Sequence, residues 1–199
     1  MRGPYFLAGH FRYAGFTLVE LLLTVFILSL CLLLAAPALQ EFFVKIKLRR
    51  IADDFAQTVF KARNTAVGKN VCTTMCISSS VDKDLPACGS KGDADWQPGW
   101  MLFLNPSCDA NKNTPDALQD IIELRMGWSE EYYLQSQSGV KKINFNARGG
   151  NAIANASEFD IYYRSAGNAL NDKYGLNICL DALGRVRTIP SSRSCNNYK

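Results

Sequence analysis

A long apolar run close to the N-terminus places the strongest constraint on how this 199-residue chain can fold. From Phe16 to Ala36 there are 21 residues, and the ionisable side chains among them are Glu20 and the thiol of Cys31. As one helix that rises about 1.5 Å per residue, this run spans a hydrocarbon core of about 30 Å. A carboxylate inside such a segment is costly, which marks Glu20 as a functional residue with a partner.

The residues at the start of the apolar run form a motif. Gly15 precedes the sequence FTLVE at 16–20, and this order resembles the processing site of type IV prepilins, which include the pseudopilins of type II secretion. The resemblance implies that a prepilin peptidase removes residues 1–15 as a leader and that Phe16 is then N-methylated. It also implies that Glu20 faces the N-terminal amine of a neighbouring pilin in a filament. The alternative is an ordinary signal anchor.

Charge and composition argue against an enzyme. The formal net charge is +4, and removal of the two leader arginines, Arg2 and Arg12, lowers it to +2. The single histidine, His10, also lies in the leader, so the mature chain has no histidine for acid–base, triad or zinc-protease chemistry. The sequence contains no glycine-rich phosphate loop. We therefore expect a protein that is not an enzyme and has no cofactor.

Six cysteines follow the apolar run: Cys72, Cys76, Cys88, Cys108, Cys179 and Cys195. An even number in a loop-rich segment predicts disulfides and an oxidising compartment. Locality favours Cys179–Cys195 and Cys76–Cys88, which leaves Cys72–Cys108, although sequence alone does not choose among the possible pairings. A zinc site on Cys72 and Cys76 is an alternative, but no second CxxC follows at finger spacing, so we expect no metal.

Basic residues flank the apolar run on both sides. Two lie in the leader, and four follow closely: Lys45, Lys47, Arg49 and Arg50. The positive-inside rule alone would leave the following domain in the cytoplasm. However, the prepilin resemblance implies a cytoplasmic leader, and the cysteines suit the periplasm. We expect a single-pass inner-membrane protein whose C-terminal domain lies in the periplasm and later in a pilus on the cell surface.

The helical pattern continues beyond the apolar run and is followed by strand patterns. Apolar residues recur every three to five positions from Leu39 to Ala62, and Gly68 is a plausible stop. Short apolar segments separated by Gly, Asn, Ser and Pro then predict strands. We expect them at residues 71–78, 100–104, 121–125, 132–135, 141–145, 159–163, 176–180 and 185–189.

These patterns predict an α+β fold of the type IV pilin-like kind. A long N-terminal helix packs on one antiparallel β-sheet or two small ones. The expected parts are a transmembrane or filament-core helix at 16–38, its amphipathic continuation at 39–68, and a β-rich pilin domain at 69–199 with a disulfide-closed basic tail at 179–195.

Later motifs make the resemblance more specific, because their order is that of the FimT/GspH family of minor pilins and pseudopilins. The matching features are Cys76, WQPGWMLF at 96–103, INF at 143–145, Arg148-Gly149, CL at 179–180 and GRVR at 184–187. Cys72 and Cys108 have no counterpart in the family pattern.

The C-terminal segment is the most basic part of the mature chain. Residues 173–199 carry five basic side chains and one acidic side chain. In a strand at 185–189, Arg185 and Arg187 would share one face about 6.7 Å apart, close to two phosphate steps of about 3.4 Å along a DNA strand. Arg193 and Lys199 would widen this patch. The alternative is that Arg185 and Arg187 are solvated edge-strand charges that block edge-to-edge pairing with other chains.

In FimT-type minor pilins of naturally transformable bacteria, a GRxR motif in the C-terminal region binds DNA. The motif matches here at Gly184, Arg185 and Arg187. The resemblance therefore implies weak, sequence-independent binding of double-stranded DNA for uptake in natural transformation, by a subunit whose other partners are major and minor pilins. The alternatives are another anionic partner, or a structural minor pilin or type II secretion pseudopilin that primes filament assembly without binding DNA.

Overall fold

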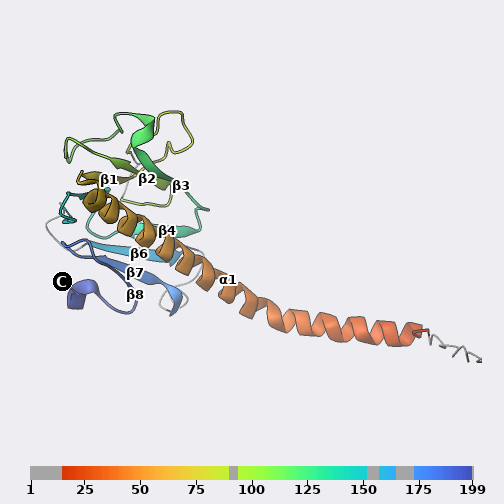
Figure 1. Cartoon of the computed structure of the whole chain (residues 1–199). Helices are drawn as coiled ribbons and strands as arrows, with labels where there is room; N and C mark the ends of the chain where they lie inside the picture. The colour runs from red at the N-terminus through yellow and green to blue at the C-terminus, as the bar shows by residue number, and fades with distance from the viewer. Residues whose placement is uncertain (1–14, 90–93, 152–156, 165–172, 199) are drawn as a thin grey trace, which may run out of the picture. The chain divides into compact units, whose positions relative to one another are not determined.

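The computed structural model describes residues 15–89, 94–151, 157–164 and 173–198. Most of the leader (residues 1–14) and Lys199 lie outside these ranges. The elements in the described ranges are α1 (Leu18–Lys69), β1 (Thr73–Ile77), β2 (Gly99–Leu104), η1 (Leu118–Asp120), β3 (Ile121–Met126), β4 (Tyr132–Ser136), β5 (Lys142–Phe145), β6 (Ser157–Tyr163), β7 (Leu176–Leu180), β8 (Val186–Pro190) and η2 (Cys195–Tyr198) (Figure 1).

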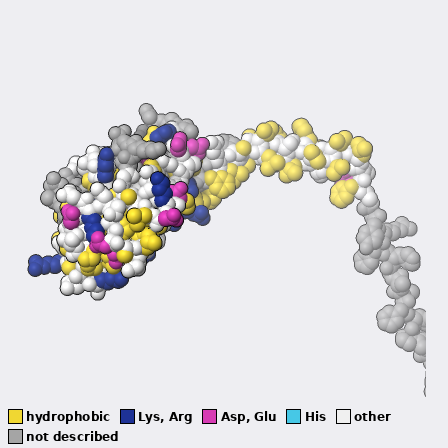
Figure 2. Space-filling view, turned by 90° about the horizontal axis from the view of Figure 1, so that it is seen from above, with side chains coloured by type: hydrophobic (Ala, Val, Ile, Leu, Met, Phe, Trp, Pro, Cys, Tyr) yellow, Lys and Arg dark blue, Asp and Glu magenta, His cyan; other side chains and the backbone are white. Residues whose placement is uncertain are grey.

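The chain divides into two compact units, residues 1–42 and 43–199. In the first unit, Thr17 caps α1, because its Oγ1 accepts a hydrogen bond from the backbone N–H of Glu20 at 3.2 Å. Glu20 lies in the first turn, where a carboxylate interacts favourably with the helix dipole. Leu18–Ala36 is long and apolar enough to cross a membrane, and its large apolar side chains are exposed (Figure 2).

The second unit has a hydrophobic core of its own. The part of α1 in this unit buries a side chain at almost every third or fourth position: Val44, Leu48, Ile51, Ala52, Phe55, Val59, Ala62 and Ala66. The ring of Phe55 packs edge-on against Trp96 and Trp100, with centroids 5.2 and 5.5 Å apart. All buried members of this cluster lie between Val44 and Leu180 in the sequence, so residues 43–199 carry a complete core without the N-terminal apolar segment.

Two antiparallel four-stranded sheets complete this core. Their strand orders are β3-β2-β1-β5 and β4-β6-β7-β8. In Figure 1, α1 crosses both sheets, and residues from all three contribute to one buried cluster. The predicted α+β pilin-like fold is therefore confirmed, with two small sheets rather than one.

The end of α1 differs from the sequence expectation. Gly68 was the expected stop, but it lies inside the last turn, and Asn70 takes the left-handed conformation with φ of +52°. The N–H of Asn70 donates to the carbonyl of Val67 and the N–H of Val71 to that of Ala66, at 3.3 and 3.1 Å. These two bonds form a Schellman motif, in which asparagine replaces the more usual glycine.

The six cysteines form three disulfides in the structure. They are Cys72–Cys108, Cys76–Cys88 and Cys179–Cys195, which is the pairing that locality favoured. Cys72 and Cys76 thus have different disulfide partners. Zinc requires thiolates, so the alternative of a zinc site on this pair is wrong.

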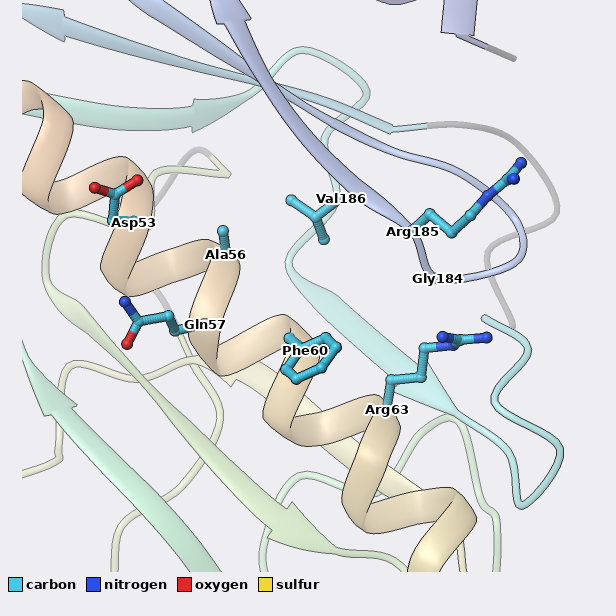
Figure 3. A pocket seen from close by; sticks show the side chains of 8 residues that line it. All are labelled: Asp53, Ala56, Gln57, Phe60, Arg63, Gly184, Arg185 and Val186. Atoms are coloured by element: carbon cyan, nitrogen blue, oxygen red, sulfur yellow. The ribbon is translucent and has the colours of Figure 1, made fainter.

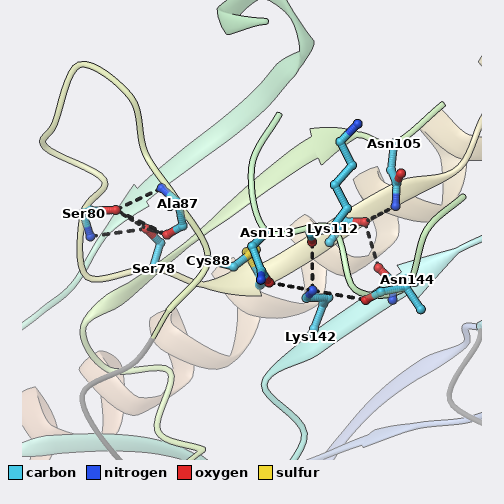
Figure 4. Close-up of a disulfide and its surroundings, with 12 residues drawn as sticks. Ser78, Ser80, Ala87, Cys88, Asn105, Lys112, Asn113, Lys142 and Asn144 are labelled. Carbon is cyan, nitrogen blue, oxygen red and sulfur yellow. Dashed lines mark hydrogen bonds between the residues drawn. A yellow bond between two sulfur atoms is a disulfide. The ribbon is translucent and has the colours of Figure 1, made fainter. Parts of the chain in front are cut away.

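Lys142 fastens the loop that contains Cys108 to the first sheet. Its ammonium group donates to the carbonyl oxygens of Ala110 and Lys112 and to Oδ1 of Asn113, at 3.1, 2.8 and 2.8 Å (Figure 4). Burial lowers the pKa of Lys142, and the nearby carboxylate of Asp109 opposes this effect. The half-buried Lys142 therefore provides the hydrogen-bond donors that these three loop oxygens require.

Candidate functional site

The turn between β7 and β8 carries the glycine of the GRVR motif. The N–H of Gly184 donates to the carbonyl of Asp181 at 2.9 Å, and the N–H of Asp181 donates to the carbonyl of Arg185 at 3.1 Å. Gly184 has φ of +75°, and a Cβ at this position would lie 2.6 Å from Cε1 of Phe145. Both the conformation and the close packing therefore require glycine here.

Arg185 lies in this turn and is bound to Asp181. Its Nε donates to Oδ2 of Asp181 at 2.5 Å, and its backbone N–H donates to Oδ1 at 2.8 Å. Burial raises the pKa of the Asp181 carboxyl, but the hydrogen bonds and charge of Arg185 outweigh burial, so this pKa lies below its ordinary value. Asp181 therefore stays ionised and offsets part of the arginine's charge, although 69% of the Arg185 side chain is exposed.

This arrangement corrects the predicted strand at 185–189. The strand begins at Val186, so Arg185 is not a strand neighbour of Arg187. The reason is local: Asp181, four residues earlier, holds the backbone and side chain of Arg185 in the turn. The predicted separation of about 6.7 Å assumed two residues of rise along one strand, so it does not apply to Arg185 and Arg187.

Arg187 lies on the outer face of the second sheet. Val186 packs against the core shared with α1, whereas Arg187 is exposed and stands opposite Cys179 in the β7–β8 register. Ile189 packs with Cys179 and Cys195 on the same face. Alternation thus places Arg187 beside the C-terminal disulfide, on the edge strand of this sheet.

Arg193 belongs to the segment that follows this edge strand. Its side chain is exposed, and its carbonyl accepts a hydrogen bond from Nδ2 of Asn177 at 3.0 Å. The same amide nitrogen donates to Oε1 of Glu158 at 3.0 Å, and Glu158 stands opposite Cys179 on β6. The outer face therefore carries arginine and carboxylate side chains together.

A basic residue from α1 approaches the turn from the other side. Arg63 donates from Nε to the carbonyl of Gly149 at 3.1 Å, and a Cβ on Gly184 would lie 3.0 Å from Cδ of Arg63. No sequence motif marks Arg63, which follows Ala62 in the apolar pattern of the helix, so it was not predicted to belong to the site. Next to it lies a hollow of about 440 Å³, lined by Asp53, Ala56, Gln57, Phe60, Arg63, Gly184, Arg185 and Val186 (Figure 3).

The N-terminal motif forms a separate candidate region. Gly15 and Phe16 lie just before Thr17, the N-cap of α1, and 79% of Phe16 is exposed. Glu20 is exposed one turn further along the helix. The residues that are expected to act in processing and assembly therefore lie together at the start of α1.

Two family profiles match the chain. The profile described as type II transport protein GspH matches residues 52–184, and that of the prokaryotic N-terminal methylation motif matches residues 10–36. No curated protein matches the chain.

Two solved structures of one minor pilin share the fold at low sequence identity. Two crystal forms of the type IV minor pilin FimU of Pseudomonas aeruginosa are 17% and 18% identical to the chain, with TM-scores of 0.52 and 0.55. These matches cover 73% and 76% of this chain, and 94% and 95% of FimU. The minor pseudopilin EpsH of the Vibrio cholerae type 2 secretion system is 12% identical with a TM-score of 0.47, over 73% of this chain and 98% of EpsH.

Proposed function

The chain belongs to the family of the type II transport protein GspH, and we propose that this minor pilin or pseudopilin binds extracellular DNA through its C-terminal arginines. The observation that carries the proposal is the exposure of Arg185, Arg187 and Arg193 on one short, disulfide-closed segment. Guanidinium groups suit phosphate oxygens, because their planar fork can form two parallel hydrogen bonds. Uptake of the captured DNA in natural transformation is the biological role that we infer.

Assembly into a filament is the other part of the proposal. A prepilin peptidase would cleave between Gly15 and Phe16, and Phe16 would be methylated, with the domain on the periplasmic side of the inner membrane. Glu20 would then meet the amine of a neighbouring major or minor pilin, since a carboxylate in an apolar environment needs a cationic partner. The match to the methylation motif at residues 10–36 supports this processing.

The geometry favours weak and sequence-independent binding. The three arginines come from a turn, an edge strand and the segment beyond it, so no helix is offered to a DNA groove for base reading. Three phosphate contacts give a slope of log K against log salt of about −2.7. Asp181 and Glu158 lower the local positive charge further. Several copies or several subunits in one filament would raise the avidity.

The test uses the oxidised second unit, residues 43–199, which holds a complete core. Its affinity for a short DNA duplex is measured by fluorescence anisotropy between about 50 and 200 mM salt. The measurement is repeated with Arg185→Gln plus Arg187→Gln. We expect salt-sensitive binding that the double substitution weakens at least about tenfold. Absence of binding by the folded wild type, or binding that ignores both substitutions, overturns the proposal.

A purely structural subunit is the second candidate, and a specific contact favours it. Asp181 already neutralises part of Arg185, and Arg187 lies on an edge strand that ends in Pro190. Charged side chains and proline on an edge strand prevent pairing with other sheets. If this is their role, the double variant will self-associate at concentrations where the wild type is monomeric, and neither will bind DNA.

A further inference from the structure

Two glycine turns meet at one place on the surface of the second unit. Gly149 has φ of +78° and Gly184 has φ of +75°. A Cβ on Gly184 would lie 3.2 Å from the carbonyl oxygen of Gly149, so the two backbones are in direct contact. Each glycine has an exposed arginine as its sequence neighbour, Arg148 before Gly149 and Arg185 after Gly184. The contact between the turns therefore brings the backbone positions of two arginines from distant parts of the sequence close together.

Both turns are held firmly. In the first, Oδ1 of Asn146 accepts hydrogen bonds from the N–H groups of Arg148 and Gly150 at 2.9 and 3.0 Å. The N–H of Gly149 donates to the carbonyl of Asn146 at 2.9 Å. In the second, Asp181 holds Arg185 as described above. The backbones that carry the two arginines are thus ordered before any ligand binds, which lowers the entropic cost of binding.

Arg63 supplies a third guanidinium at the same junction. Its Nε donates to the carbonyl of Gly149, and its Cδ would touch a Cβ on Gly184. Figure 3 shows that the ends of the Arg63 and Arg185 side chains point to the same side, away from the helix residues that line the hollow. With the carboxylate of Asp181 on Arg185, the three arginines and this aspartate carry a net charge of +2.

We propose that Arg63, Arg148 and Arg185 form one composite phosphate-binding site, built from α1, the turn after β5 and the turn after β7. Three arginines carried by one ordered backbone junction and the helix beside it suit a tetrahedral oxyanion with several acceptor oxygens. The inference rests on the proposed function, in which the ligand is a phosphate of the DNA backbone. The GRVR motif then contributes to two surfaces. Arg185 acts with Arg63 and Arg148, whereas Arg187 and Arg193 contact the DNA backbone from the outer face of the sheet.

The test measures the salt dependence of DNA binding for single variants of residues 43–199. Arg148→Gln is the main variant because its side chain is exposed, and Arg63→Gln is the second. Lys83→Gln, an exposed residue in the loop closed by Cys76–Cys88, removes the same charge elsewhere. We expect each arginine variant to lower the magnitude of the salt slope by about 1 and the affinity about two- to fivefold. Lys83→Gln should leave both at wild-type values.

The outcomes separate the two proposals. If Arg148→Gln keeps the wild-type slope and affinity while Arg185→Gln plus Arg187→Gln weakens binding at least about tenfold, DNA binding stands and the composite site is overturned. If the wild type does not bind DNA, the proposed function fails, and inorganic phosphate is titrated while the amide NMR signals of Gly149 and Gly184 are followed. Shifts that Arg148→Gln abolishes support the site as a phosphate site, and unchanged signals overturn it.

Discussion

Two basic segments of this protein look alike in sequence but differ in their burial. Lys141-Lys142-Ile143 and Arg185-Val186-Arg187 each place basic residues at the start of a strand. Lys142 is half-buried and its ammonium group is surrounded by three oxygens of a loop, whereas Arg185 and Arg187 are exposed. Burial, rather than residue type, separates the cation that stabilises a loop from those that remain at the surface.

The largest change in the free energy of unfolding is expected from a substitution at Gly184, in the turn that carries Arg185. Gly184→Ala forces a left-handed conformation on alanine and places its Cβ 2.6 Å from Phe145. We expect a loss of about 3 kcal/mol in the free energy of unfolding, from backbone strain and overpacking together. Urea denaturation of the oxidised second unit measures it.

Gly139→Ala is the matched control for that substitution. Gly139 also has a left-handed φ, +70°, but no atom lies within 4 Å of its Cβ position. It should cost only the conformational strain, about 1 kcal/mol. Equal losses for the two variants would show that the close packing of Gly184 against Phe145 adds nothing to the cost.

The next effect concerns the half-buried Lys142. Lys142→Met removes the donor for three loop oxygens and should lower the free energy of unfolding by about 2 kcal/mol. Lys141→Met, at the exposed neighbouring position, should change it by less than about 0.5 kcal/mol. Hydrogen exchange of the amides at residues 109–113 should rise in the Lys142 variant alone. Similar values for the two lysine variants would contradict the distinction between the segments.

The exposed arginines should show the opposite pattern. Arg185→Gln plus Arg187→Gln should change the free energy of unfolding by less than about 1 kcal/mol, because surface ion pairs contribute little. The same variant should weaken DNA binding at least about tenfold, as the loss of two phosphate contacts implies. Chemical denaturation and anisotropy on one protein preparation measure both. A large loss of stability with unchanged DNA affinity would mean that these arginines stabilise the fold, as Lys142 does, and do not bind DNA.

The smallest effect is the pH dependence that comes from Asp181. The pKa of its carboxyl is lowered in the folded state, so its stabilising contribution is complete above the unfolded pKa, about 3.9, and is lost as pH falls through the folded pKa. Asp181→Asn should therefore be less stable than the wild type near pH 6, and the difference should shrink below about pH 4. Denaturation curves at several pH values measure this. A constant difference would mean that the ion pair with Arg185 adds no stability.

Much of the fold was predictable because its signals are local. The apolar run, the helical period beyond it and the eight strand patterns all depend on residues close in sequence. The disulfides also followed locality, since two of them join cysteines 12 and 16 residues apart and leave one pair over. The two local errors, at Gly68 and at Arg185, both arose at turns. The backbone of Asn70 adopted the left-handed conformation that glycine usually takes, and the carboxylate of Asp181 bound Arg185.

The sequence by itself determined the membrane-length helix, the α+β architecture and the family resemblance, because periodicity and short motifs carry that information. Only the tertiary structure decided which cations are buried and which gather at a surface. The contact between Gly149 and Gly184, with Arg63 across it, joins residues 35 to 121 positions apart in the chain. No pattern within a short window encodes such a contact, since it exists only after α1 and both sheets have packed into one core.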